Sequence, residues 1–211
     1  MRLLRVRQPF DDPGFIFELK LDGFRGLAFI ENGHCQLVSR NGHMFKQWAS
    51  LTREIAASVQ CRTAVLDGEI ACLDPDGRSN FYALMFRRRA PFFCAFDLLM
   101  LDGEDLRGLP LLERKRRLLD VMARIQSRVR YVDHVHESGV RFFELACERD
   151  LEGVVAKYAN GTYQTDSATT SWLKVQNPRY SQAEGRAELF EQRKSPERPG
   201  RKSPAPRLVL I

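Results

Sequence analysis

Hydrophobic and polar residues alternate along several short stretches of the chain, which is the pattern of half-buried β-strands. These stretches cover residues 15–31, 35–40, 63–73, 92–100, 153–157 and 172–175. The first two are separated by Asn32-Gly33, a strong signal for an antiparallel hairpin. Antiparallel strands with helices inserted between them indicate an α+β fold, with flanking helices, rather than a doubly wound parallel sheet.

Four other stretches repeat their hydrophobic residues at helical spacing. They cover residues 49–59, 79–86, 111–129 and 138–149. In residues 111–129 the apolar positions and the aliphatic stem of Lys115 share one side, with the arginines expected on the outside. Ser138 is expected to cap the last of these helices.

The composition indicates one main domain followed by a different kind of segment. The chain has 211 residues, of which 44% are hydrophobic, enough for a core. Its net charge is +6, and residues 193–207 hold six arginines and lysines, four prolines and one glutamate. We therefore expect a domain over residues 1–192 and a disordered basic tail over 193–211, able to contact phosphate backbones or merely to aid solubility.

Several classes of protein are disfavoured by the sequence. No apolar run is long enough for a membrane span, and the charged N-terminal residues are unlike a secretory signal, so a cytoplasmic protein is expected. The five cysteines are widely spaced without a CxxC pair, and the four histidines lack a ligand spacing. Buried free thiols are expected rather than disulfides or zinc ligands.

The most informative chemistry lies around Lys20, in the string Glu18-Leu19-Lys20-Leu21-Asp22-Gly23-Phe24-Arg25. In an extended strand, Glu18, Lys20 and Asp22 would share one face. A lysine attacks phosphorus only as the neutral amine, and nearby carboxylates favour the ammonium. Arg25 and a bound metal could offset them, so the pattern suits a nucleotide phosphate site, although an edge strand with a solvated ion pair is also possible.

Further functional groups lie beside other predicted strands. Asp67 and Glu69 share one face of theirs, opposite the apolar side chains. Phe96 is either a core residue or a stacking platform for a base. Glu152 and Lys157 flank an apolar run, and regular alternation would point them to opposite faces; Lys174 lies in the last strand.

Together these strings resemble the ordered motifs of ATP-dependent DNA ligases. The strings are KLDGFR at 20–25, SRNG at 39–42, LDGE at 66–69, FDLL at 96–99, EGVVAK at 152–157 and WLKV at 172–175. The resemblance runs from about residue 9 to residue 186, and it is nearest to the ligase domains of bacterial non-homologous end-joining enzymes. It implies a nucleotide cleft of the ATP-grasp-like type shared by DNA ligases and mRNA capping enzymes.

The resemblance also implies a role for each residue. Lys20 would attack ATP and carry AMP, which then passes to a DNA 5′-phosphate during repair. Glu152 would bind Mg²⁺ or Mn²⁺, with Glu69 contacting the ribose and assisting with the metal. The remaining nucleotide contacts would come from Glu18, Arg25, Arg40, Phe96 and Lys174, with weaker indications for Asp22, Lys157 and Gln176.

Two departures from the family pattern change these expectations. The usual WxKxK has Gln176 in place of its second lysine, so a neutral amide replaces a charge near the triphosphate. No strand alternation follows residue 186, so no OB-fold is expected within this sequence. The expected partners are DNA ends or nicks and, for full sealing, a separate OB-fold or end-binding protein.

Two alternatives to a DNA ligase adenylation domain stay open at this point. One is an RNA ligase or GTP-using capping-type nucleotidyltransferase, since the fold alone does not distinguish them. The other is a noncatalytic module that binds nucleotides or DNA ends. The nucleotide that labels Lys20 would discriminate a GTP-using enzyme, and DNA binding without any adduct would indicate the noncatalytic module.

Overall fold

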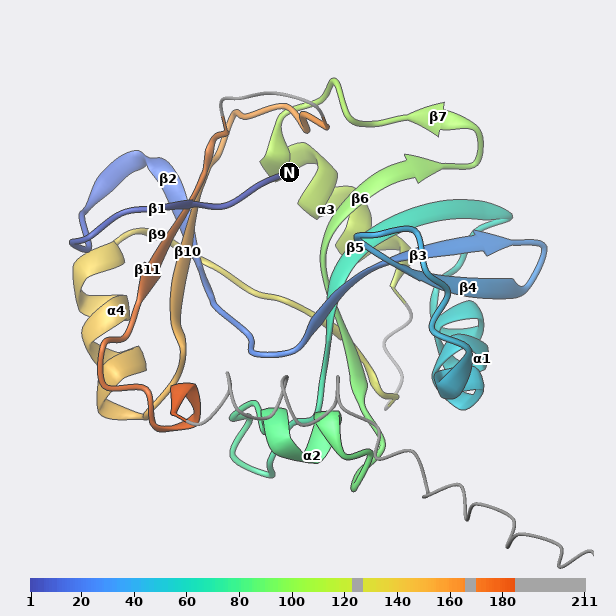
Figure 1. Cartoon of the computed structure of the whole chain (residues 1–211). Coiled ribbons are helices and arrows are strands. Elements are labelled where there is room, and N and C mark those ends of the chain that lie inside the picture. The colour runs from blue at the N-terminus through green and yellow to red at the C-terminus, as the bar shows by residue number, and fades with distance from the viewer. Residues whose placement is uncertain (123–126, 166–169, 185–211) are drawn as a thin grey trace, which may run out of the picture. The chain divides into compact units, whose positions relative to one another are not determined.

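The computed structural model describes residues 1–122, 127–165 and 170–184, and the tail predicted over 193–211 lies outside them. Residues Met1–Tyr180 form one compact unit, and a second unit begins at Ser181 with the short 3₁₀ turn Ser181–Ala183. The first unit contains two β-sheets with helices against them (Figure 1). Their strand pairs are mostly antiparallel, so the predicted α+β fold is confirmed.

The first sheet has the strand order β1-β11-β10-β2-β9. Its strands are β1 (Leu4–Arg5), β2 (Asp12–Leu19), β9 (Val135–Glu137), β10 (Gly153–Tyr158) and β11 (Trp172–Gln176). Helix α4 (Gly139–Glu148) packs against β10 and β2. This sheet therefore joins the first strand of the Lys20 region to the EGVVAK and WLKV strands, which lie far away in the sequence.

The second sheet has the order β4-β3-β5-β6-β7, with β8 pairing beside β6. Its strands are β3 (Phe24–Glu31), β4 (His34–Ser39), β5 (Thr63–Ala71), β6 (Phe92–Leu101), β7 (Glu104–Asp105) and β8 (Val129–Tyr131). The hairpin between β3 and β4 turns at Asn32 and Gly33, whose φ angles of 48° and 78° are those of the predicted tight turn.

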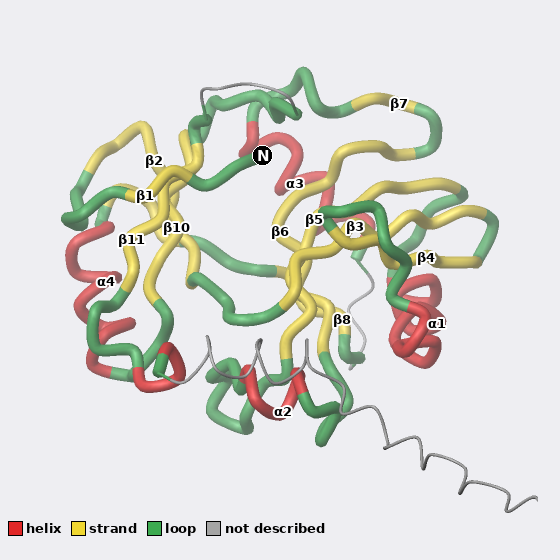
Figure 2. The backbone as a smooth tube through the Cα atoms, viewed as in Figure 1, coloured by secondary structure: helices red, strands yellow, loops and turns green. Residues whose placement is uncertain are grey.

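The helices of the second sheet are α1 (Ala49–Ser58), α2 (Phe81–Met85) and α3 (Leu111–Val121), with a 3₁₀ turn at Lys46–Trp48. Leu51 and Ile55 of α1 are fully buried, as its helical spacing predicts. They belong to the largest hydrophobic core, which lies between α1, α3 and this sheet. Figure 2 shows these helices in red around the yellow strands.

The expectation of one continuous strand over residues 15–31 is wrong. The chain leaves the first sheet after Leu19 and enters the second at Phe24. At Gly23, a Cβ atom would lie 2.1 Å from the carbonyl oxygen of Ile70 on β5, so only glycine permits this close approach.

Two smaller expectations fare differently. Helix α3 ends at Val121 rather than 129, and Val129 begins strand β8, so the predicted end of that helix is wrong. Ser138 occupies the N-cap position of α4 as predicted, but its side chain makes no capping hydrogen bond. A run of hydrophobic residues at helical spacing does not show where one element ends and the next apolar strand begins.

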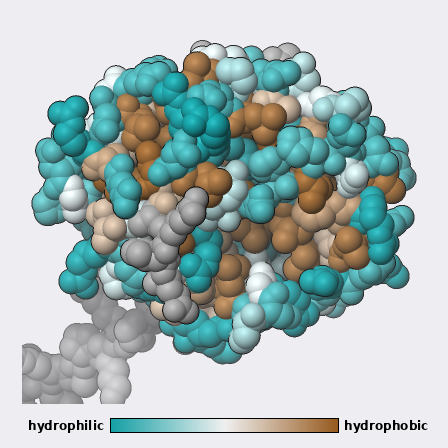
Figure 3. All heavy atoms as spheres, turned by 180° about the vertical axis from the view of Figure 1, so that it is seen from behind, coloured by the Kyte–Doolittle hydropathy of each residue, from teal (hydrophilic) through white to brown (hydrophobic). Residues whose placement is uncertain are grey.

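Seen from behind, hydrophobic residues are interspersed among hydrophilic ones (Figure 3). Exposed apolar side chains of this kind are normal in soluble domains.

No helix in the described part is long and apolar enough to span a membrane. All the cysteines are free thiols, with Cys72 and Cys94 buried.

Candidate active site

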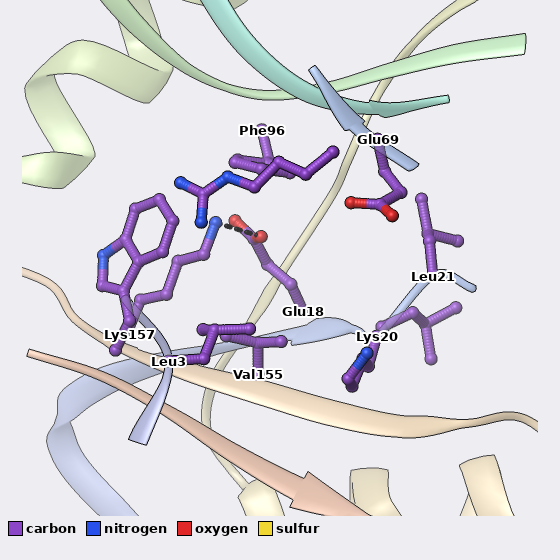
Figure 4. Close-up of a pocket in the computed structure, with 11 residues that line it drawn as sticks. Leu3, Glu18, Lys20, Leu21, Glu69, Phe96, Val155 and Lys157 are labelled. Carbon is purple, nitrogen blue, oxygen red and sulfur yellow. Dashed lines mark ion pairs between the residues drawn. The ribbon is translucent and has the colours of Figure 1, made fainter. Parts of the chain in front are cut away.

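A pocket between the two sheets brings together residues from most of the strings singled out in the sequence (Figure 4). It is lined by Leu3, Glu18, Leu19, Lys20, Leu21, Arg25, Glu69, Phe96, Val155, Lys157 and Trp172. Strands β2, β10 and β11 supply one wall, and β3, β5 and β6 supply the other. The sequence motifs therefore meet in space at one site.

Lys20 is the first residue after strand β2, where the chain leaves the sheet. Its backbone N–H donates to the carbonyl oxygen of Gly153 at 2.9 Å, which ties the loop to β10. Its Nζ lies 2.7 Å from Oε1 of Glu152, and the two side chains are 16% and 11% exposed. The amine is thus held in place yet accessible from the pocket.

Glu152 reaches Lys20 because the backbone is irregular at Gly153. Its φ of 137° lies outside the range that side-chain-bearing residues adopt, and a Cβ there would lie 2.1 Å from the Val175 carbonyl oxygen. The prediction that Glu152 and Lys157 point to opposite faces assumed regular alternation through this glycine. In the structure Lys157 lines the pocket while Glu152 pairs with Lys20, so both side chains reach the site.

Glu69 lies on β5 across the pocket from Lys20. Burial raises the pKa of Glu69 to about 8, against the opposing charges of Lys20 and Arg25. The negative charge of Glu152 contributes in the same direction as burial. A carboxyl with this pKa is largely protonated at neutral pH unless a cation binds beside it.

The donor set fits a hard divalent cation. Oε2 of Glu152 is buried and has no hydrogen-bond partner among the described residues. Magnesium is commonly held by one or two carboxylates together with substrate phosphates, rather than by a cage of protein ligands. No group of three or more acidic, histidine or cysteine side chains suited to a metal occurs in the described part, so phosphate oxygens would have to complete the coordination.

An aromatic wall closes the opposite end of the pocket. The rings of Phe96 and Trp172 meet edge to face at 5.7 Å. Nζ of Lys157 lies 4.2 Å from the Phe96 ring centroid and 4.1 Å from that of Trp172. Phe96 is partly exposed and lines the pocket, and the Arg25 guanidinium also lies over its ring, 5.5 Å from the centroid, so a planar ligand stacking on Phe96 would meet both cations.

Arg25 is fixed by a network that the sequence did not reveal. Its guanidinium forms a bidentate pair with Asp67, whose Oδ2 also accepts from the Tyr163 hydroxyl at 2.8 Å. Burial alone would lower the pKa of Arg25, but Asp67 raises it overall. Asp67 therefore orients Arg25, and Glu69 alone of this carboxylate pair faces the pocket.

Helix α3 supplies two buried cations that sequence reasoning placed wrongly or left unassigned. Arg114 was expected outside, yet it is fully buried and binds both carboxylate oxygens of Asp97 at 2.8 Å. Nζ of Lys115 lies 2.6 Å from Glu18 Oε1. Their adjacent positions on a helix face that otherwise carries leucines were the available signal.

Five predicted residues lie outside the lining of this pocket: Glu152, which pairs with Lys20 and lines an adjacent smaller pocket, and the four that follow. Asp22 is buried and accepts a hydrogen bond from the Tyr180 hydroxyl at 2.8 Å, because the crossing at Gly23 turns it away from Glu18 and Lys20. Arg40 is exposed and lines a neighbouring hollow together with Arg25 and Asp67. Lys174 and Gln176 are partly exposed on β11, on the strand that supplies Trp172.

This fold and this site define a class of protein: a nucleotidyltransferase domain, with a lysine and a glutamate paired at a pocket between two antiparallel sheets. The chain belongs to the ATP-dependent DNA ligase domain family, whose model matches residues 5–176. The family resemblance noted in the sequence is thereby confirmed.

Named relatives place the chain near bacterial repair ligases. It is 33% identical over 165 residues to the multifunctional non-homologous end joining protein LigD of Pseudomonas aeruginosa, covering 75% of this chain and 20% of that protein. It is 30% identical over 188 residues to the SPbeta prophage-derived DNA ligase-like protein LigB of Bacillus subtilis, covering 86% of this chain and 68% of that one. The chain thus spans about a fifth of the first relative's length.

Solved structures show the same arrangement. The ligase domain of M. tuberculosis LigD superposes with a TM-score of 0.67 at 27% identity, over 82% of this chain and 58% of that one. A mycobacterial DNA ligase D complexed with ATP and MES gives a TM-score of 0.65 at 26% identity, over 82% of this chain and 60% of that one.

Proposed function

We propose that this domain transfers AMP from ATP to Lys20 and then to a DNA 5′-phosphate during strand joining. The observation that carries the proposal is the Lys20–Glu152 pair, 2.7 Å apart and partly exposed at a pocket with an aromatic wall. Membership of the ATP-dependent DNA ligase family supports ATP as the nucleotide and DNA as the acceptor.

In this mechanism Nζ of Lys20 attacks the α-phosphorus of ATP. A nitrogen–phosphorus bond forms, the bond to the β-phosphate oxygen breaks, and pyrophosphate leaves. The attacking nitrogen must lose protons, and Oε1 of Glu152 is the acceptor nearest to it. Phe96 and Val155 would hold the base between them, since they line the two walls of the pocket.

Glu152 and Glu69 would hold Mg²⁺ or Mn²⁺, which when bound neutralises the charge that develops on the phosphates. Arg25, kept in place by Asp67 and Tyr163, would contact the ribose or phosphate. Lys174 and Arg40 would contact the phosphates and the DNA end from their positions beside the pocket. In the second step the AMP moves to the DNA 5′-phosphate, and in the third a 3′-hydroxyl displaces it.

The test is intact-mass measurement of the full chain after incubation with ATP and Mg²⁺. The protein should gain the mass of one adenylyl group, and peptide mapping should place it on Lys20. Lys20→Ala should gain none. Lys46→Ala, which changes an exposed lysine of the second sheet's 3₁₀ turn, is the matched control and should label like the wild type.

Other outcomes select the alternatives. Labelling by GTP but not ATP would indicate a capping-type enzyme, and AMP transfer to RNA but not DNA would indicate an RNA ligase. Binding of nicked duplex without any adduct would identify a noncatalytic module. Sealing of a nicked duplex by the labelled protein is a separate assay, because the adduct and the final joining step can fail independently.

A further inference from the structure

One carboxylate at the closed end of the pocket holds two lysines. Glu18 is 2% exposed, and each of its oxygens takes a separate ammonium. Lys115 of α3 lies 2.6 Å from Oε1, and Lys157 of β10 lies 2.5 Å from Oε2. The neighbouring buried carboxylate, Asp97, is committed to Arg114. When all three groups are ionised, the cluster of Glu18, Lys115 and Lys157 therefore carries a net positive charge, because one carboxylate faces two ammonium groups.

The two lysines occupy different surroundings. Nζ of Lys115 also donates to the Val132 carbonyl oxygen at 2.8 Å and lies 4.5 Å from the Tyr131 ring centroid, away from the pocket lining. Nζ of Lys157 lies against the pocket's aromatic rings and points to Glu18 in Figure 4. Lys115 is thus a permanent counterion, and Lys157 is the member that a ligand can meet.

Electrostatics separate the pair in the same way. Burial alone would lower the pKa of Lys115, but Glu18 raises it overall. Burial lowers the pKa of Lys157 in spite of Glu18, and the positive charge of Lys115 lowers it further. A charge on Lys115 therefore loosens the hold of Glu18 on the second lysine.

We propose that Lys115 is a positioning residue for nucleotide binding: by pairing with Glu18 from outside the pocket, it weakens the pairing of Glu18 with Lys157, so that Lys157 can turn to donate a hydrogen bond to the base of ATP beside Phe96. Lys115 itself touches no ligand. The inference rests on the proposed function for the identity of the nucleotide, and on the described contacts for everything else. Without Lys115, Glu18 would hold Lys157 as its only counterion.

The test is equilibrium binding of ATP, followed by fluorescence of Trp172 in the pocket wall, alongside the rate of adduct formation at saturating ATP. Lys115→Met should raise the dissociation constant about tenfold while the saturated rate changes by less than about twofold. Lys115→Gln, which keeps a hydrogen-bonding group without the charge, should behave alike and replaces the first variant if that one fails to fold. Arg116→Met, an exposed change on the same helix, should bind normally.

A double-mutant cycle distinguishes this role from simple loss of packing. In a Lys157→Met background, the Lys115 substitution should cost no further ATP affinity, because its effect passes through Lys157. Additive losses, unchanged affinity in both Lys115 variants, or a fall in the saturated rate alone would overturn the proposal. Since ATP binding is read separately from the adduct, a chain that binds ATP but never labels Lys20 would refute the proposed function and leave this inference standing.

Discussion

Two ion pairs of the domain, Arg114–Asp97 in the interior and Lys20–Glu152 at the pocket, differ in how completely they are satisfied. Arg114 and Asp97 are fully buried, bind through two parallel hydrogen bonds, and have further acceptors in the Leu109 and Gly161 carbonyls. Lys20 and Glu152 make a single contact, remain partly exposed, and leave Glu152 Oε2 without a partner in the described part of the chain. The first pair stabilises the fold, whereas the second retains an unused hydrogen-bond acceptor that a substrate or cation can meet.

The largest expected effect is on the buried Arg114–Asp97 pair. Asp97→Ala should lower the free energy of unfolding by about 3–5 kcal/mol, because it leaves Arg114 charged and buried without its carboxylate. Urea denaturation followed by circular dichroism measures this loss. The double variant Asp97→Ala with Arg114→Met should recover part of it; a single variant as stable as the wild type would contradict the comparison.

The Lys20–Glu152 pair should respond in the opposite manner, with a large loss of activity and a small loss of stability. Glu152→Gln should slow adduct formation on Lys20 by roughly a hundredfold, since it removes both the proton acceptor and a candidate cation ligand. Its free energy of unfolding should change by less than about 1 kcal/mol, as expected for a partly exposed pair. Single-turnover labelling and urea denaturation of the same sample test both halves, and a large stability loss would place this pair with the first.

Glu69 provides a test by pH. Its folded pKa of about 8 exceeds the unfolded value of 4.5, so between these values the folded chain holds a proton that the unfolded chain has released. The free energy of unfolding should then fall as pH rises, by up to about 1.4 kcal/mol per pH unit from this group. Glu69→Gln should flatten that slope. Equal slopes in urea titrations of both proteins would show that Glu69 ionises normally.

The smallest expected effect is at Gln176, on the strand that carries Lys174. Gln176→Lys should raise the rate of adduct formation a few-fold, on the order of 0.5–1 kcal/mol of barrier, by adding a positive charge near the triphosphate. The rate of adduct formation is measured by quenching the labelling reaction at successive times, with ATP in excess over the protein. Gln176→Met, which adds no charge, serves as the control, and an unchanged rate in the lysine variant would sink the idea.

Much of the architecture was predictable because its signals are local. The Asn32-Gly33 hairpin, helix α1 and strands β5, β6, β10 and β11 follow from turn residues and hydrophobic periodicity within short windows. The motif strings also indicated that Lys20, Glu69 and Phe96 belong to one site, and the structure places all three in the lining of one pocket.

The rest depends on contacts between distant residues. Alternation did not show the crossing at Gly23, because the space it needs is set by Ile70 on another strand. Burial of Arg114 depends on Asp97, seventeen positions away, and periodicity treats an arginine as a surface residue wherever it falls. Likewise, Lys115 appeared as an aliphatic stem, since its partner Glu18 lies ninety-seven positions away.

Gly153 shows how one backbone angle can change the chemistry of a strand. Gly153 is the first residue of β10, and its positive φ lets Glu152, just before the strand, pair with Lys20 while Lys157, within the strand, lines the pocket. A side chain at this position would do more than strain the peptide. It would push against the Val175 carbonyl oxygen of β11, and the backbone shift needed to relieve that contact would move Glu152 away from the nucleophile it pairs with.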